Sequence, residues 1–203
     1  MPGVQAVVHD WLHSDDLLSL LAEAMEMNFK RIQGGSGDGL ETHQSTYYKV
    51  GLRELLKGVR DFERPSIEIA DPFARNCPWG THTNDIDPST KAHDHLDALE
   101  WLREFSDGYF DHVLFDPPFS QNQAERYEAG HVNIYTSPGY VKGCTNEIFR
   151  ILKPGGTMLK LGYNSARPNG FEISKGWVVN FGGNRNDVLM TILVKSQMVL
   201  EDF

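Results

Sequence analysis

Four consecutive residues, Asp116-Pro117-Pro118-Phe119, bring together groups that could do chemistry on an amine. An aromatic amine is a poor nucleophile because its lone pair is delocalised into the ring. Asp116 and the carbonyl of Pro117 could each accept one N–H of such an amine, which would draw electron density onto the nitrogen as it attacks. Phe119 could stack on a base that has left its helix. The four residues therefore suit methylation of an exocyclic amine. A plain strand exit, in which Asp116 caps a turn, is the alternative.

The elements around this tetrad must place it at the edge of a sheet. Val113 to Phe115 is an uninterrupted apolar run of the kind found inside parallel sheets. Two prolines cannot continue a central strand, so the chain must leave the sheet at Asp116. Open α/β sheets bind their ligands at this carboxyl edge. The sequence therefore predicts a ligand site at the end of this strand.

Two earlier stretches end in acidic residues in a similar way. Ile67 to Ala70 is expected to form a short strand, from which Asp71 to Arg75 turns away. Another short strand should end near residues 84–88. Asp97 then precedes a helix whose apolar residues cluster on one face, namely Leu99, Leu102 and Phe105.

The rest of the chain supplies further elements of an α/β domain. Residues 1–64 are interpreted as a helical front piece that contains a glycine-rich mobile loop at 33–39, and residues 65–203 as the main domain. After the tetrad we expect, in order, a long loop at 121–138, a helix at 139–152 ended by Lys153-Pro154-Gly155-Gly156, a strand at 157–161, and strands at 177–181 and 188–195 joined by a hairpin turn at 182–186.

Composition favours a soluble globular protein with a formal charge of −9. No apolar run approaches the length of a membrane span, no signal pattern is visible, and the two cysteines form no zinc or disulfide pattern, so a cytoplasmic setting and no membrane partner are expected. Residues 1–120 carry 10 basic and 21 acidic side chains, whereas residues 121–195 carry 9 and 5. A nucleic-acid backbone would lie along the second, basic segment, although an ordinary solvated surface explains this distribution equally well.

The order of these motifs resembles the class I S-adenosylmethionine-dependent methyltransferases, in particular those that methylate the N6 amine of adenine in nucleic acid. Asp116 to Phe119 matches the [DNS]-P-P-[YFW] tetrad of that group, and Lys153 to Gly156 matches an element common to many methyltransferases. The resemblance covers roughly residues 65–197. It implies a Rossmann-like α/β fold with a seven-stranded, mostly parallel sheet and a terminal antiparallel hairpin.

The resemblance also implies roles for individual residues. Asp116, Pro117, Pro118 and Phe119 would form the catalytic tetrad. S-adenosyl-L-methionine would be the cofactor and S-adenosyl-L-homocysteine the product, with no metal required. The implied cofactor-binding residues are Asp71, Phe73 and Ala74 for the methionine part, Asp85 (or Asp87) for the ribose hydroxyls, and Asp97 with the Ala98 backbone for the adenine.

The chain departs from the family pattern in three respects. The turn from Asp71 to Asn76 contains no glycine, the spans 71–85 and 87–97 are too short for the usual helices, and no separate target-recognition domain is visible. The first interpretation is a DNA adenine N6 methyltransferase. RNA adenine or DNA cytosine N4 as the target, and a non-catalytic subunit that binds the cofactor, are the alternatives. DNA is the expected partner, with RNA as the second choice; the sequence leaves the oligomeric state open.

Overall fold

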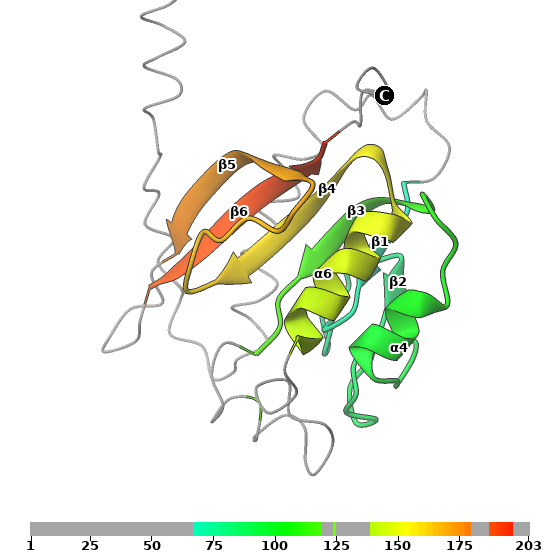
Figure 1. Cartoon of the computed structure of the whole chain (residues 1–203). Helices are drawn as coiled ribbons and strands as arrows, with labels where there is room; N and C mark the ends of the chain where they lie inside the picture. The colour runs from blue at the N-terminus through cyan, green and yellow to red at the C-terminus, as the bar shows by residue number, and fades with distance from the viewer. Residues whose placement is uncertain (1–66, 119–123, 125–138, 180–186, 197–203) are drawn as a thin grey trace, which may run out of the picture.

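A twisted six-stranded sheet forms the centre of the described part of the chain. The computed structural model describes residues 67–118, 124, 139–179 and 187–196. The strands lie in the order β2-β1-β3-β4-β6-β5 (Figure 1). The elements, in chain order, are β1 (Ile69–Asp71), β2 (His82–Thr83), α4 (Ala98–Arg103), β3 (Phe110–Phe115), α6 (Tyr140–Ile151), β4 (Leu152–Gly162), β5 (Phe171–Val179) and β6 (Val188–Lys195).

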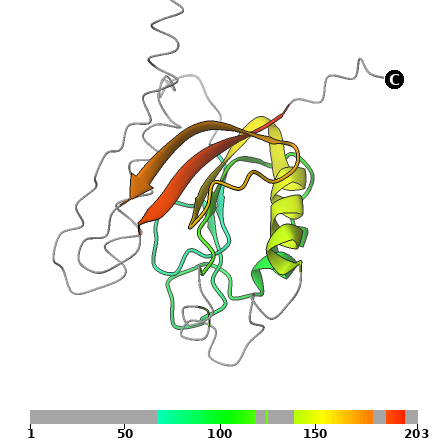
Figure 2. The ribbon, with the colours of Figure 1, turned by 60° about the vertical axis from the view of Figure 1, so that its left-hand side comes forward.

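The strand directions agree with the expected mixed sheet. β2, β1, β3 and β4 are parallel neighbours. β6 lies between β4 and β5 and is antiparallel to both (Figure 2). The prediction of a parallel sheet with one antiparallel strand near the end is therefore confirmed.

The prediction of seven strands is wrong for the described part of the chain, which has six. The edge beyond β2 has only an isolated parallel bridge between Asn84 and Asp94. Residues 84–97 are mostly Asp, Pro, Ser, Thr, Lys and His, with no apolar run that could be buried as a strand. The expected loss of helices is also observed, since none lies between β1 and β2 in residues 72–81.

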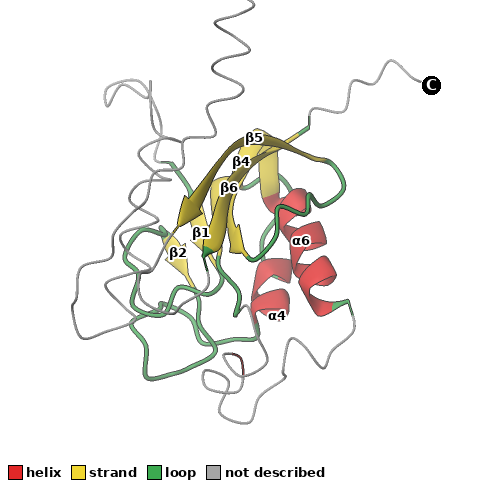
Figure 3. Cartoon of the chain, turned by 90° about the vertical axis from the view of Figure 1, so that its left-hand side faces the viewer, coloured by secondary structure: helices red, strands yellow, loops and turns green. Residues whose placement is uncertain are grey.

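Both described helices that can be placed against the sheet, α4 and α6, cover the same face (Figure 3). Alternate residues of β3 point to opposite sides, as the pleat requires. Val113 and Phe115 pack in the cluster under the helices, with Trp101 of α4 and Ile148 of α6. Leu114 packs in a second cluster with residues of β4, β5 and β6. These two clusters fix where β3 ends and hence where Asp116 lies.

Element boundaries differ from the expectations in two places. α6 passes directly into β4, so Lys153 to Gly156 lies inside a strand that starts at Leu152. Gly155 allows this through a positive φ of 73°. β5 starts at Phe171 rather than at 177. The first half of this strand was not expected, because it carries exposed polar residues of the kind that edge strands tolerate.

Several expected elements lie outside the described residues: the front piece at 1–64 with its glycine-rich stretch, most of the 121–138 segment, and the turn at 182–186. The division of the chain into a front piece at 1–64 and a main domain at 65–203 therefore stays a prediction. Among the described helices, none has the length and apolarity needed to cross a membrane.

Candidate functional site

Three neighbouring parallel strands end at the same edge of the sheet and bring acidic residues there. Asp71 is the last residue of β1, Asn84 and Asp85 follow β2, and Asp116 follows β3. The order β2-β1-β3 makes these strand ends adjacent. Acidic residues that are far apart in sequence therefore meet at the carboxyl edge, where open α/β sheets bind ligands.

Asp71 is the most deeply placed of these acids. Its side chain is fully buried. Its Oδ1 atom accepts the N–H of Phe73 at 3.3 Å, whereas no described residue donates to Oδ2. Burial, followed by the negative charges of Asp116 and Asp85, raises the pKa of the Asp71 carboxyl well above its usual range. A buried carboxylate with an unused oxygen and acidic neighbours is suited to a cationic ligand.

The loop after β1 achieves its turn without glycine. Arg75 has a φ of 48°, in the left-handed region that favours glycine. Asp85 holds this conformation, because its Oδ2 accepts the Arg75 N–H at 3.0 Å. The Oδ1 atom of Asp85 accepts the N–H of Asp87, also at 3.0 Å. The carboxylate predicted to bind ribose thus already stabilises two backbone amides, and Asp87 receives hydrogen bonds from Ser89.

Asn84 is a residue that sequence analysis did not single out. It is fully buried, and its side chain donates to the carbonyls of Pro72 (3.3 Å) and Leu96 (3.0 Å) and accepts the Leu96 N–H (2.9 Å). Its backbone carbonyl accepts the N–H of Ala74 at 2.9 Å. Asn84 therefore ties the loop after β1 to the segment before α4. The only sign of this role in the sequence is that Asn84, a residue with a side-chain amide, stands near the end of an expected strand.

Asp97 has a structural role in addition to its predicted contact with adenine. It is the N-cap of α4, since Oδ1 accepts the N–H groups of Leu99 (2.9 Å) and Glu100 (3.2 Å). Its Oδ2 accepts the hydroxyl of Tyr140, at the start of α6, at 2.7 Å. Ala98 is buried at the first position of the helix.

The chain leaves the sheet after Phe115, as predicted. Asp116 and Pro118 are half-buried and Pro117 is buried. The ring of Phe73 packs edge-on against Phe115, 5.8 Å between centroids, so this predicted cofactor residue also contacts the strand that ends in the tetrad. Phe119 lies outside the described residues.

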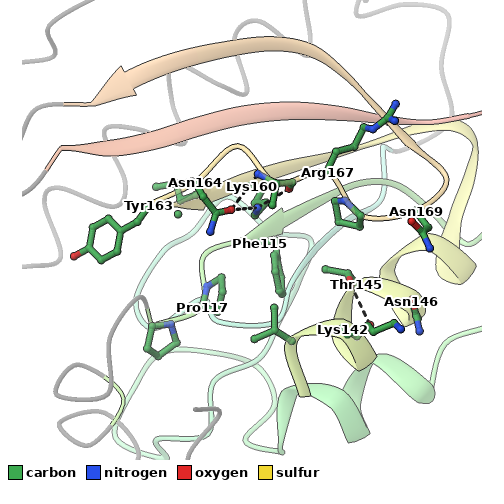
Figure 4. A pocket seen from close by; sticks show the side chains of 16 residues that line it. Phe115, Pro117, Lys142, Thr145, Asn146, Lys160, Tyr163, Asn164, Arg167 and Asn169 are labelled. Atoms are coloured by element: carbon green, nitrogen blue, oxygen red, sulfur yellow. Dashed lines mark hydrogen bonds between the residues drawn. The ribbon is translucent and has the colours of Figure 1, made fainter. Parts of the chain in front are cut away.

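Pro117 and Pro118 also line a pocket of about 640 Å³ (Figure 4). It lies between α6 and the segment that follows β4. Apolar side chains from Phe115, Val141 and Leu161 line part of it. Sequence analysis did not identify it, because its walls come from separate segments. No group of three or more His, Cys, Asp or Glu side chains suited to a metal ion occurs in the described ranges.

Solved structures show similarity to this fold. TrmN from Thermus thermophilus aligns with a TM-score of 0.50 and 18% identity, over 72% of this chain and 47% of that one. The proposed methyltransferase yhhF from Escherichia coli aligns with a TM-score of 0.47, 11% identity and coverage of 76% and 88%. The proposed methylase HI0767 from Haemophilus influenzae gives 0.46, 14%, and coverage of 75% and 99%. This chain thus spans about half the length of TrmN.

No protein-family model matches the sequence, and no curated protein shows significant sequence similarity to it. At 18% identity, the similarity to TrmN concerns the fold alone. Together with the parallel β2-β1-β3-β4 order and the antiparallel β6, it shows that the chain has a Rossmann-like α/β fold.

Proposed function

We propose that the protein transfers a methyl group from S-adenosyl-L-methionine to the exocyclic N6 amine of adenine in DNA. One observation carries this proposal: the acidic edge around Asp71 lies directly beside the strand end that presents Asp116, Pro117 and Pro118. A site for a cation and a site for an amine would thereby meet at one strand.

The acidic edge fits the proposed cofactor. S-adenosyl-L-methionine carries a positively charged sulfonium and an α-ammonium group, and when bound it supplies an electrophilic methyl group. Asp71 offers a buried oxygen to which no described residue donates, and such an oxygen would suit the ammonium group. Asp97, at the start of α4, would face the adenine and share its Oδ2 between the adenine amine and the Tyr140 hydroxyl.

Asp116 and Pro117 would act on the acceptor. The Asp116 carboxylate and the Pro117 carbonyl would accept the two N–H groups of the amine, so that the nitrogen lone pair turns out of the ring plane toward the methyl group. As the N–C bond forms and the S–C bond breaks, the nitrogen loses one proton, and Asp116 would accept it. These contacts are strongest in the transition state, so they should act on turnover.

The choice of DNA adenine rests on sequence. Asp at the first tetrad position and the basic segment after residue 120 favour a nucleic-acid amine. The alternatives of RNA adenine, DNA cytosine N4 and a non-catalytic subunit are distinguished by one experiment.

The purified full chain should be incubated with tritiated S-adenosylmethionine and, separately, duplex DNA, single-stranded DNA and RNA. Digestion to nucleosides then identifies the methylated base. We expect N6-methyladenine from DNA, and none from the Asp116→Ala variant. Label in RNA would identify RNA as the acceptor, and label in N4-methylcytosine would identify cytosine as the target base. Cofactor binding without transfer to any substrate would overturn the proposal in favour of the non-catalytic subunit.

A further inference from the structure

The pocket beside Pro117 and Pro118 differs in charge from the rest of the molecule. Its described lining includes three cations, Lys142, Lys160 and Arg167, and no acidic residue. The whole chain carries a formal charge of −9, so this local excess of positive charge is not a consequence of composition. A pocket of this kind should attract an anion.

Lys160 has a role in building the pocket. Its Nζ donates to the carbonyl of Ala166 at 2.8 Å and to Oδ1 of Asn164 at 3.4 Å (Figure 4). The same Asn164 oxygen accepts the N–H of Ala166 at 3.0 Å. Lys160 thus holds residues 163–168 in place, which leaves Lys142, exposed on α6, and the exposed Arg167 as the cations available to a ligand.

The other polar side chains of the lining are amides. Asn146 on α6 and Asn169 after β4 are both exposed and lie at one end of the pocket (Figure 4). A carboxamide presents a donor and an acceptor together, which is the pattern that pairs with the edge of a nucleobase. The pocket therefore combines positive charge with groups suited to a base.

An exposed aromatic ring stands at the opposite end. Tyr163 is 49% exposed and lies at the same end of the pocket as Pro117 (Figure 4). An aromatic ring on a surface that also carries positive charge is a stacking platform for bases in single-stranded nucleic acid. It would stand close to the point where the proposed acceptor amine is held.

We propose that this pocket holds the nucleotide adjacent to the methylated base, with Lys142 at a phosphate and Tyr163 stacked on a base. Lys160 is a positioning residue for the loop that carries Tyr163. This inference rests on the proposed function, because it names the acceptor strand as the ligand. It also assigns a role in recognition of the acceptor strand to residues in the described part of the chain.

The test uses a fluorescent single-stranded adenine-containing oligodeoxynucleotide and the full chain. In steady-state assays, Lys142→Gln and Tyr163→Ala should each raise KM about tenfold, with kcat within about twofold of wild type. The affinity for S-adenosylhomocysteine should not change. Arg103→Gln, which removes an exposed cation from α4, is the matched control and should leave KM unchanged.

A binding assay without cofactor gives a second readout. A plot of log affinity against log salt concentration has a negative slope. Its magnitude should decrease by about 0.7 in Lys142→Gln and stay unchanged in Tyr163→Ala and Arg103→Gln. Lys160→Met should raise KM at unchanged kcat, and Lys160→Arg should restore it. Unchanged KM and salt slope in Lys142→Gln and Tyr163→Ala would overturn the inference.

The two proposals can fail separately. Weaker oligonucleotide binding by the pocket variants, with no methylation by the wild type, would overturn the proposed function and support the pocket. Methylation by the wild type, with oligonucleotide binding unaffected in the pocket variants, would support the proposed function and overturn the pocket assignment. Tighter binding of the matching oligoribonucleotide would overturn the choice of DNA and leave the pocket assignment standing.

Discussion

The carboxyl end of β3 separates two regions of opposite character. On the β1 and β2 side, buried acidic residues around Asp71 repel one another. Most of their carboxylate oxygens accept hydrogen bonds from backbone N–H groups. On the α6 side lies an open pocket whose described lining includes cations and no acids. A cationic cofactor and an anionic acceptor would each be attracted to one side only. The difference indicates how a single strand end could keep two substrates apart and bring their reacting atoms together.

The largest effect should come from the residue between the two regions. Asp116→Ala removes the acceptor for the amine N–H and should lower turnover by about a hundredfold or more, with cofactor affinity nearly intact. Asp116→Asn keeps one oxygen acceptor and should retain more activity. Single-turnover methylation and calorimetric titration with S-adenosylhomocysteine measure the two quantities. Glu172→Ala, at an exposed position of β5, is the control. Wild-type turnover in Asp116→Ala would show that the tetrad is only a strand exit.

The next effect tests whether the acidic region is built for a cation. Asp71→Asn should weaken S-adenosylhomocysteine binding about tenfold to a hundredfold, because a charge-assisted hydrogen bond to the ammonium group is lost. The same variant should raise the free energy of unfolding of the free protein at pH values above the folded-state pKa of Asp71, because it removes a buried charge among like charges. A variant that loses affinity and stability together would contradict this account.

The pH dependence of the wild type should agree with that change. The pKa of Asp71 is raised in the folded state, so the folded protein holds this proton more tightly than the unfolded chain. The free energy of unfolding should therefore fall as pH rises from about 4, the pKa expected in the unfolded chain, through the raised folded pKa. Denaturant titrations across this range should show a weaker fall in Asp71→Asn.

A smaller effect separates the two roles of Asp97. Serine is also a good N-cap, so Asp97→Ser should preserve α4 while removing the carboxylate. We expect about tenfold weaker S-adenosylhomocysteine binding, with the melting temperature lowered by only a few degrees through loss of the Tyr140 bond. Tyr140→Phe loses the same bond and keeps the carboxylate, so its cofactor affinity should stay at the wild-type value. Equal affinity in both variants would mean that Asp97 serves only the fold.

The smallest effect concerns the loop after β1. Arg75→Gly and Arg75→Ala remove the same charge but differ in tolerance of a φ of 48°. The glycine variant should be more stable than the alanine variant by about 1 kcal/mol. Thermal unfolding of the two variants measures this difference. Equal stability would show that the hydrogen bond from the Arg75 N–H to Asp85 does not impose the left-handed turn.

Sequence alone could predict the strand ends, because apolar runs followed by Asp and Pro leave few alternatives. Alternation predicted the strands at 177–181 and 188–195, and the family resemblance implied their antiparallel arrangement. Sequence alone could not predict that Asp97 would bond to Tyr140, since that contact depends on how α4 and α6 pack. The first half of β5 was missed because edge strands tolerate polar residues. The basic pocket was missed because three segments that are separate in sequence contribute its described walls.

The hydrogen bonds of Asn84 have a consequence for how the acidic edge meets its ligand. The Asn84 side chain connects Pro72 and Leu96, and the Asn84 backbone carbonyl accepts the N–H of Ala74, so both loops are anchored by hydrogen bonds internal to the protein. The amide protons of Ala74 and Leu96 should accordingly exchange slowly with solvent in the ligand-free protein. A ligand arriving at this edge would meet loops that are already ordered, so little of its binding energy would be consumed in ordering them.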